Sequence, residues 1–147
     1  MDISELAPRR DEDDRVRNPG GSTRVALFTG DDVATIAAAA SLREVADQLV
    51  ASDVGLLVVG SADHVEGVVS ERDLVRAIAE GGAPDTTSVR DVIHTGIVWC
   101  DVTATVDEVA EMMMEHYVRH VLIEDGGRLV GIVSARDLLG AYAWDPE

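Results

Sequence analysis

The chain of 147 residues has no lysine, one cysteine, and only two Trp, two Tyr and one Phe. A single cysteine, Cys100, excludes an intramolecular disulfide framework and any metal site built from several cysteines. No apolar run approaches the roughly 20 residues that a membrane span requires, and residues 1–17 lack the apolar stretch of a secretory signal. The sequence therefore predicts a cytoplasmic protein without a membrane segment.

The positive charge comes entirely from 12 arginines, against 28 acidic residues, which gives a formal net charge of −16. Residues 1–23 contain six acids and four arginines, so −14 of this charge belongs to the rest of the chain. A surface of this sign repels phosphate backbones and anionic lipid. Nucleic acid and membranes are therefore not expected as partners.

The most informative feature of the chain is an internal repeat. Residues 33–79 align with residues 97–143 at a constant offset of 64, with thirteen identities in 47 positions and no gap. This agreement indicates a duplication, so the two copies are expected to fold alike.

Each copy has the pattern of a β-α-β-β-α unit, which predicts an α+β fold. Ser41 and Thr105, each with Glu three residues later (Glu44 and Glu108), are capping boxes that begin a helix with one apolar face. The β-branched runs that follow are typical of buried strands joined in a hairpin. The predicted strands are 33–36, 54–59 and 65–69, then 97–100, 118–123 and 129–133, and the final helices are 71–80 and 135–144.

Both copies end in the motif Gly-h-h-Ser-x-Arg-Asp (h, aliphatic), at residues 67–73 and 131–137. With the tandem β-α-β-β-α units, this motif resembles a pair of CBS domains, or Bateman module, over residues 24–143. The resemblance implies two repeats packed about a pseudo-twofold axis, with an adenosine ligand in the clefts between them. AMP, ADP and ATP are the expected ligands, ahead of NAD and S-adenosylmethionine, and no cofactor is expected. The expected domains are a polar arm at 1–23, repeat 1 at 24–84, and repeat 2 with a short extension at 85–147.

The pairs Ser70 with Asp73, and Ser134 with Asp137, have two interpretations. The Ser-x-x-Asp spacing is itself a helix cap that needs no ligand. A helix N-terminus also attracts phosphate through its free N–H groups, and an Asp one turn later can accept ribose hydroxyls, as acidic residues do in dinucleotide sites. The resemblance favours the second interpretation, and the first stays open.

The resemblance implies that each cleft is shared between the repeats. The first cleft consists of Thr29, Asp32, Ala34, Val54, Gly55, Ser134, Arg136 and Asp137, and the second of Ser70, Arg72, Asp73, Ile93, Gly96, Val98, Val118, Arg119 and His120. Where the second copy has the basic pair Arg119-His120, the first has Gly55-Leu56, and the first cleft also carries the acid Asp32. We therefore expect phosphorylated ligands to prefer the second cleft.

No catalytic motif is present: the chain has no G-x-S-x-G, Walker A loop or G-x-G-x-x-G. His116 and His120 are four residues apart, but a change from helix to strand is expected between them, so no metal site is predicted. The sequence indicates a non-catalytic regulatory module that binds an adenine nucleotide and forms a homodimer through the helices at 71–80 and 135–144. The alternative is a structural or protein-interaction module with empty clefts.

Overall fold

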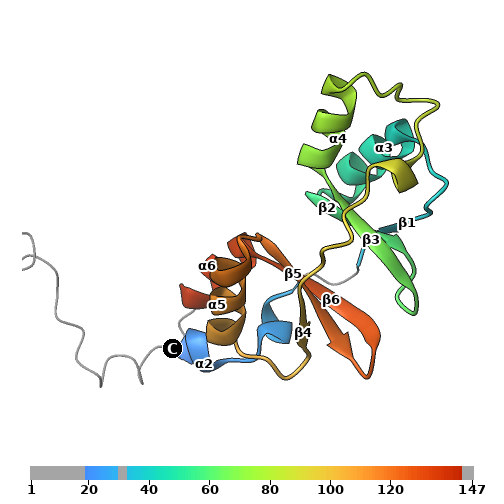
Figure 1. Cartoon of the computed structure of the whole chain (residues 1–147). Coiled ribbons are helices and arrows are strands. Elements are labelled where there is room, and N and C mark those ends of the chain that lie inside the picture. The colour runs from blue at the N-terminus through green and yellow to red at the C-terminus, as the bar shows by residue number, and fades with distance from the viewer. Residues whose placement is uncertain (1–18, 30–32, 144–147) are drawn as a thin grey trace, which may run out of the picture.

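The structure is a computed structural model that describes residues 19–29 and 33–143. Each copy of the repeat forms one lobe, in which two helices pack on a three-stranded sheet (Figure 1). The first lobe contains β1 (Thr35–Ile36), α3 (Leu42–Ser52), β2 (Leu56–Gly60), β3 (Val65–Ser70) and α4 (Glu71–Ala79). The second contains β4 (Trp99–Asp101), α5 (Val106–His116), β5 (His120–Asp125), β6 (Arg128–Ser134) and α6 (Ala135–Tyr142). The predicted β-α-β-β-α order is confirmed in both copies.

The two sheets have the same mixed topology. The first strand of each lobe runs parallel to the second, which pairs antiparallel with the third. The hairpin register shifts between Val59 and Gly60 in one sheet and between Ile123 and Glu124 in the other. These shifts fall at equivalent positions of the two copies, so the duplication extends to the irregularities of the backbone.

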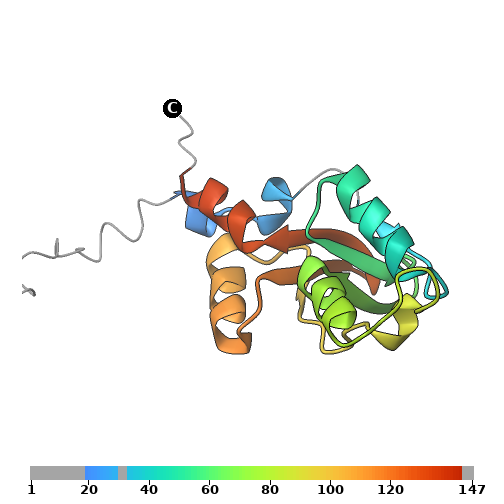
Figure 2. The same cartoon turned by 90° about the horizontal axis from the view of Figure 1, so that it is seen from above.

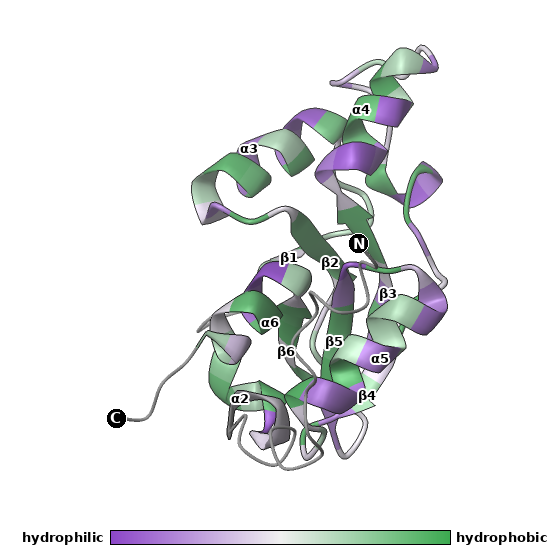
Figure 3. Ribbon diagram, turned by 90° about the vertical axis from the view of Figure 1, so that its left-hand side faces the viewer, coloured by the Kyte–Doolittle hydropathy of each residue, from purple (hydrophilic) through white to green (hydrophobic). Residues whose placement is uncertain are grey.

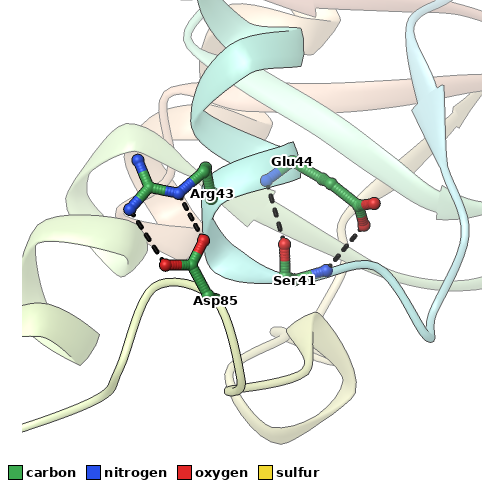
Figure 4. Close-up of polar contacts among 4 residues, drawn as sticks. All are labelled: Ser41, Arg43, Glu44 and Asp85. Carbon is green, nitrogen blue, oxygen red and sulfur yellow. Dashed lines mark hydrogen bonds and ion pairs between the residues drawn. The ribbon is translucent and has the colours of Figure 1, made fainter.

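Helix α3 begins with a complete capping box. The Ser41 hydroxyl accepts a hydrogen bond from the Glu44 N–H at 3.2 Å, and the Glu44 carboxylate accepts one from the Ser41 N–H at 2.8 Å (Figure 4). The neighbouring Arg43 pairs with Asp85 and so ties α3 to the segment that joins the lobes. In α5 the Thr105 hydroxyl accepts from the N–H of the residue three positions later at 3.3 Å, but the return bond is missing. The second predicted capping box is therefore only half formed.

Three groups of buried side chains hold the molecule together. Within the first lobe, Val45 and Leu49 of α3 pack on Val59 and Val69 of the sheet, and the second lobe repeats this arrangement. The third group lies between the two sheets and contains Leu56, Val58, Leu122 and Leu129. Figure 2 shows the strands of both lobes in the middle of the molecule, with α3 and α6 on one side and α4 and α5 on the other. In Figure 3, β2, β5 and β6 carry the hydrophobic colour, as do parts of the helices that pack around them.

The segment before the first repeat packs on the second repeat. It contains the short helix α2 (Pro19–Ser22) and the 3-10 helix η2 (Val25–Phe28). Val25 is fully buried in the core of the second lobe, and its N–H donates to the Ala104 carbonyl at 2.9 Å. Val25, which the expected bounds assign to repeat 1, therefore belongs to the core of the second lobe. Most of the predicted arm and the end of the predicted last helix, Trp144, lie outside the described residues.

The difference between the two caps can be measured with a matched pair of variants. Glu44 and Glu108 occupy the same position of their helices, and only Glu44 accepts the return bond. We expect Glu44→Ala to lower the free energy of unfolding by about 0.5–1 kcal/mol more than Glu108→Ala does. This difference is the net contribution of one such hydrogen bond to stability. Urea denaturation of both variants measures this difference, and equal losses would contradict it.

Candidate functional site

A cleft of about 950 Å³ opens between the two repeats, on the side of the strands that carries α3 and α6. The first repeat contributes the residues around β1 and the turn from α3 into β2, and the second contributes the start of β5 and the junction of β6 with α6. Its volume lies within the range of small-molecule sites, roughly 300–1,000 Å³. The lining residues are Phe28, Val33, Ala34, Asp53, Val54, Gly55, Leu56, Arg119, His120, Ile132, Ser134, Ala135, Arg136, Asp137, Leu139 and Gly140.

Ser134 and Asp137 form a helix cap at the start of α6, and this cap does not use all of their hydrogen-bonding atoms. The Asp137 N–H donates to the Ser134 hydroxyl at 3.1 Å, and the Ser134 N–H donates to Asp137 Oδ2 at 2.8 Å. Among the described residues, Asp137 Oδ1 has no hydrogen-bond partner, and the Ser134 hydroxyl proton has no acceptor. The capping interpretation of this motif is therefore correct, and it leaves a carboxylate oxygen and a hydroxyl for a ligand.

The backbone of the second sheet places two basic residues beside this cap. His120 pairs with Ser134 in the register of β5 and β6, and the Arg119 carbonyl accepts from the Ala135 N–H at 2.8 Å. Arg136, in the first turn of α6, is the third basic residue of the cleft. Three nitrogen-bearing side chains and a helix N-terminus thus gather at one end of the cleft, an arrangement that favours an anionic group.

Burial lowers the pKa of His120. The half-buried ring loses hydration in its charged form, and the positive charge of Arg119 lowers the pKa further, while the Asp137 carboxylate acts in the opposite direction. A pKa below the usual 6.5 keeps the imidazole neutral at pH 7. At pH 7 His120 therefore offers a hydrogen bond and not a full charge.

The structure brings together six of the eight residues expected in the first cleft. These are Ala34, Val54, Gly55, Ser134, Arg136 and Asp137. Thr29 instead donates its hydroxyl to the Ala26 carbonyl at 3.2 Å, and Asp32 lies outside the described residues. Sequence reasoning missed the apolar wall formed by Phe28, Val33 and Ile132, because no motif distinguishes these positions from ordinary core residues.

The second copy of the motif, at Asp73, has a different environment. Asp73 is buried, with 7% of its surface exposed. Its Oδ2 accepts from the N–H and the hydroxyl of Ser70, both at 2.8 Å, and its Oδ1 lies 2.7 Å from His94 Nε2, within ion-pair distance. Arg76 lies 3.9 Å from Oδ1. Both oxygens of this carboxylate are therefore already bonded within the chain.

The other residues expected around Asp73 are spread over several places. Ile93 packs on the core of the first lobe, and Val98 and Val118 pack on the core of the second. Arg72 and Gly96 are exposed. Arg119 and His120, on which the expected preference for the Asp73 cleft depended, line the cleft of Asp137.

Comparison with known proteins agrees with this architecture. A model of the CBS domain matches residues 28–80 and 89–143, which together are most of the chain. The chain belongs to the CBS-domain family. In the part of the chain that the structure describes, every helix is too short or too polar to cross a membrane.

Several solved CBS structures are similar along most of their length. The CBS-domain containing protein ATU1752 from Agrobacterium tumefaciens is 38% identical, with a TM-score of 0.72 over 80% of this chain and 89% of that one. The CBS domain protein PAE2072 from Pyrobaculum aerophilum, complexed with AMP, is 33% identical, with a TM-score of 0.71 over 78% and 89% of the two chains.

A curated relative is Hypoxic response protein 1 of Mycobacterium tuberculosis, 34% identical over 88 residues, or 58% of this chain and 62% of that protein. The chain spans less than two thirds of the length of the curated relatives it matches first.

The lowered pKa of His120 makes stability depend on pH. In the unfolded chain the imidazole takes up a proton near pH 6.5, whereas in the folded protein it does so only at lower pH. The unfolded state therefore binds more protons over this interval, and stability falls as the pH falls through it. We expect the unfolding free energy, measured by urea denaturation at pH 7.5, 6.5 and 5.5, to fall less steeply in His120→Gln than in the original protein. Identical slopes would contradict the assignment.

Proposed function

We propose that this CBS pair is a non-catalytic regulatory module that binds an adenine nucleotide in the cleft of Asp137. The observation that carries the proposal is the meeting, in one cleft, of the Asp137 carboxylate, the Ser134 hydroxyl at the start of α6, and the side chains of Arg119 and Arg136. The AMP complex of PAE2072 gives this ligand class a precedent within the family.

Each part of an adenine nucleotide has a chemical counterpart in the cleft. Ribose hydroxyls can donate to Asp137 Oδ1, since the cap uses only Oδ2. The face of the adenine ring can pack against the aliphatic wall that includes Val33, Val54 and Ile132. The phosphate belongs at the basic end, where bonds to Arg119 and Arg136 are charge-assisted and roughly twice as strong as neutral ones.

The charge of the whole chain makes these local arginines necessary. A net charge of −16 repels an anionic ligand at long range. Only contacts within a few ångströms, which salt screens least, can overcome that repulsion. AMP, ADP and ATP are the candidates because their terminal phosphates can bind these arginines, whereas the phosphates of NAD are internal and S-adenosylmethionine has none. We place the ligand at Asp137, and not at Asp73 as the sequence predicted, because the basic pair Arg119-His120 lines the Asp137 cleft.

Calorimetric titration with AMP tests the proposal. We expect saturable binding that Asp137→Asn weakens at least tenfold, because the variant removes the charge that ribose hydroxyls recognise and keeps the size of the side chain. Asp73→Asn is the matched control at the equivalent position of the first repeat and is expected to leave AMP affinity unchanged. The absence of binding to AMP, ADP, ATP, NAD and S-adenosylmethionine would favour a structural or protein-interaction module.

A second pair of titrations separates the phosphate from the nucleoside. We expect Arg119→Ala to weaken AMP by about 1.5 kcal/mol, roughly tenfold. Its affinity for adenosine should be nearly unchanged, since adenosine has no phosphate. Equal losses for the two ligands would place Arg119 outside the phosphate site.

We also propose that the module forms a homodimer through its helices. Val75 and Ile78 of α4, and Leu139 and Tyr142 of α6, are large apolar side chains on the surface, with Val75 66% and Leu139 71% exposed. Isologous pairing of two copies is the commonest way for a soluble protein to cover such a face. Since Val75 and Leu139 are equivalent positions of the two copies, the duplication has placed this apolar character on both repeats.

Light scattering at micromolar concentration tests the assembly. We expect a mass of twice the 15.7 kDa of one chain, and a single-chain mass for Val75→Glu, which places a charge in the contact. Val130→Glu, at an exposed position of β6, is the control and should remain dimeric. A single-chain mass for the unaltered protein would exclude the dimer.

A further inference from the structure

The Asp73 carboxylate differs from that of Asp137 because a histidine covers it. His94 Nε2 lies 2.7 Å from Asp73 Oδ1, within ion-pair distance, and the Ser70 N–H and hydroxyl both donate to Oδ2. Arg76, 3.9 Å away, adds positive charge beside the same oxygen. A ribose hydroxyl would have to displace the imidazole from an aspartate that is only 7% exposed, and bonds to such a group are strong.

The backbone fixes the position of His94. Its N–H donates to the Val68 carbonyl at 2.9 Å, and its carbonyl accepts from the Val68 N–H at 3.0 Å. The segment therefore pairs with β3 through one antiparallel β-bridge. Gly67 makes this approach possible, because a Cβ atom there would lie 2.7 Å from the His94 carbonyl oxygen. The preceding residue, Ile93, packs on the core of the first lobe. The imidazole therefore extends from a segment that is anchored by its backbone and by its neighbour in the chain.

The second repeat lacks an equivalent histidine. Thr29 lies next to Gly131 as Ile93 lies next to Gly67, and the two pairs are related by the same offset as the two repeats. The residue after Ile93 is His94, whereas the residue after Thr29 is Gly30, which has no side chain that could bond to a carboxylate. Among the described residues, Asp137 Oδ1 correspondingly has no partner.

We infer that the His94 imidazole blocks the Asp73 carboxylate, so that each chain binds one adenine nucleotide, at Asp137, and not two. The inference rests on the proposed function and adds to it the number of ligands per chain and the residue that sets this number. The duplicated motif is functional in one copy and structural in the other, because the imidazole takes the place that a ribose hydroxyl would need.

Calorimetric titration with AMP on five proteins tests the inference: the unaltered chain, His94→Ala, His94→Asn, the double variant His94→Ala with Asp73→Asn, and His64→Ala. The His94 side chain is 59% exposed, and its segment pairs with β3 through backbone atoms, so we expect the truncated variant to fold, with circular dichroism as the check. We expect one site per chain in the unaltered protein, two in His94→Ala, and one again in the double variant. His64→Ala, an exposed histidine in the turn between β2 and β3, controls for loss of a surface imidazole and should keep one site. His94→Asn, which retains a polar side chain too short for the bond, is the second variant and should also gain a site.

Two sites in the unaltered chain, or one site in both His94→Ala and His94→Asn, would show that His94 does not block Asp73. Either result would leave nucleotide binding at Asp137 intact. Binding of AMP by His94→Ala alone, lost again in the double variant, would support the block of Asp73 by His94 and overturn the proposal for Asp137. The absence of AMP binding in every variant would overturn both.

Discussion

The apolar contact between the two three-stranded sheets is the interaction on which the rest of the molecule depends. A single copy of the repeat is too small to bury enough surface for a secure fold. Leu56 and Val58 of one sheet meet Leu122 and Leu129 of the other, and together they exclude water from the centre of the molecule. The exposed ion pair between Asp63 and Arg128 adds little to this contact. The cleft exists because this packing brings the start of β2 opposite the start of α6.

One local structure occurs twice in this protein, in two different surroundings. In both repeats a serine and an aspartate cap a helix through the same reciprocal bonds, and Oδ2 of the aspartate is used in each case. The difference lies in Oδ1, which His94 occupies at Asp73 and which no described residue occupies at Asp137. A cap and a ligand site are therefore not exclusive alternatives, because a carboxylate has two oxygens and the cap needs one.

The helices and strands follow closely from local patterns. Apolar spacing and the serine caps predicted the start of α3 and the bounds of α4 and α6 to within two residues, since these signals act over one helical turn. The predicted box at Thr105 is incomplete because its second bond requires a particular rotamer of Glu108, which sequence spacing does not specify. The packing of Val25 on the second lobe was not predicted either, because its partner Ala104 lies in the other repeat, far along the chain.

The sequence by itself determined the duplication, the α+β class, the family resemblance, and the residues that form the two Ser-Asp caps, because all of these are encoded in residue types at short or fixed spacings. Only the tertiary structure decided which residues share a cleft. Arg119 and His120 line the cleft of Asp137 because β5 pairs with β6, and His94 reaches Asp73 because its segment bridges β3 beside Gly67. Both outcomes depend on contacts between strands and segments that are distant in the chain, and the pairing of those segments is set by the burial of the whole core rather than by any local motif.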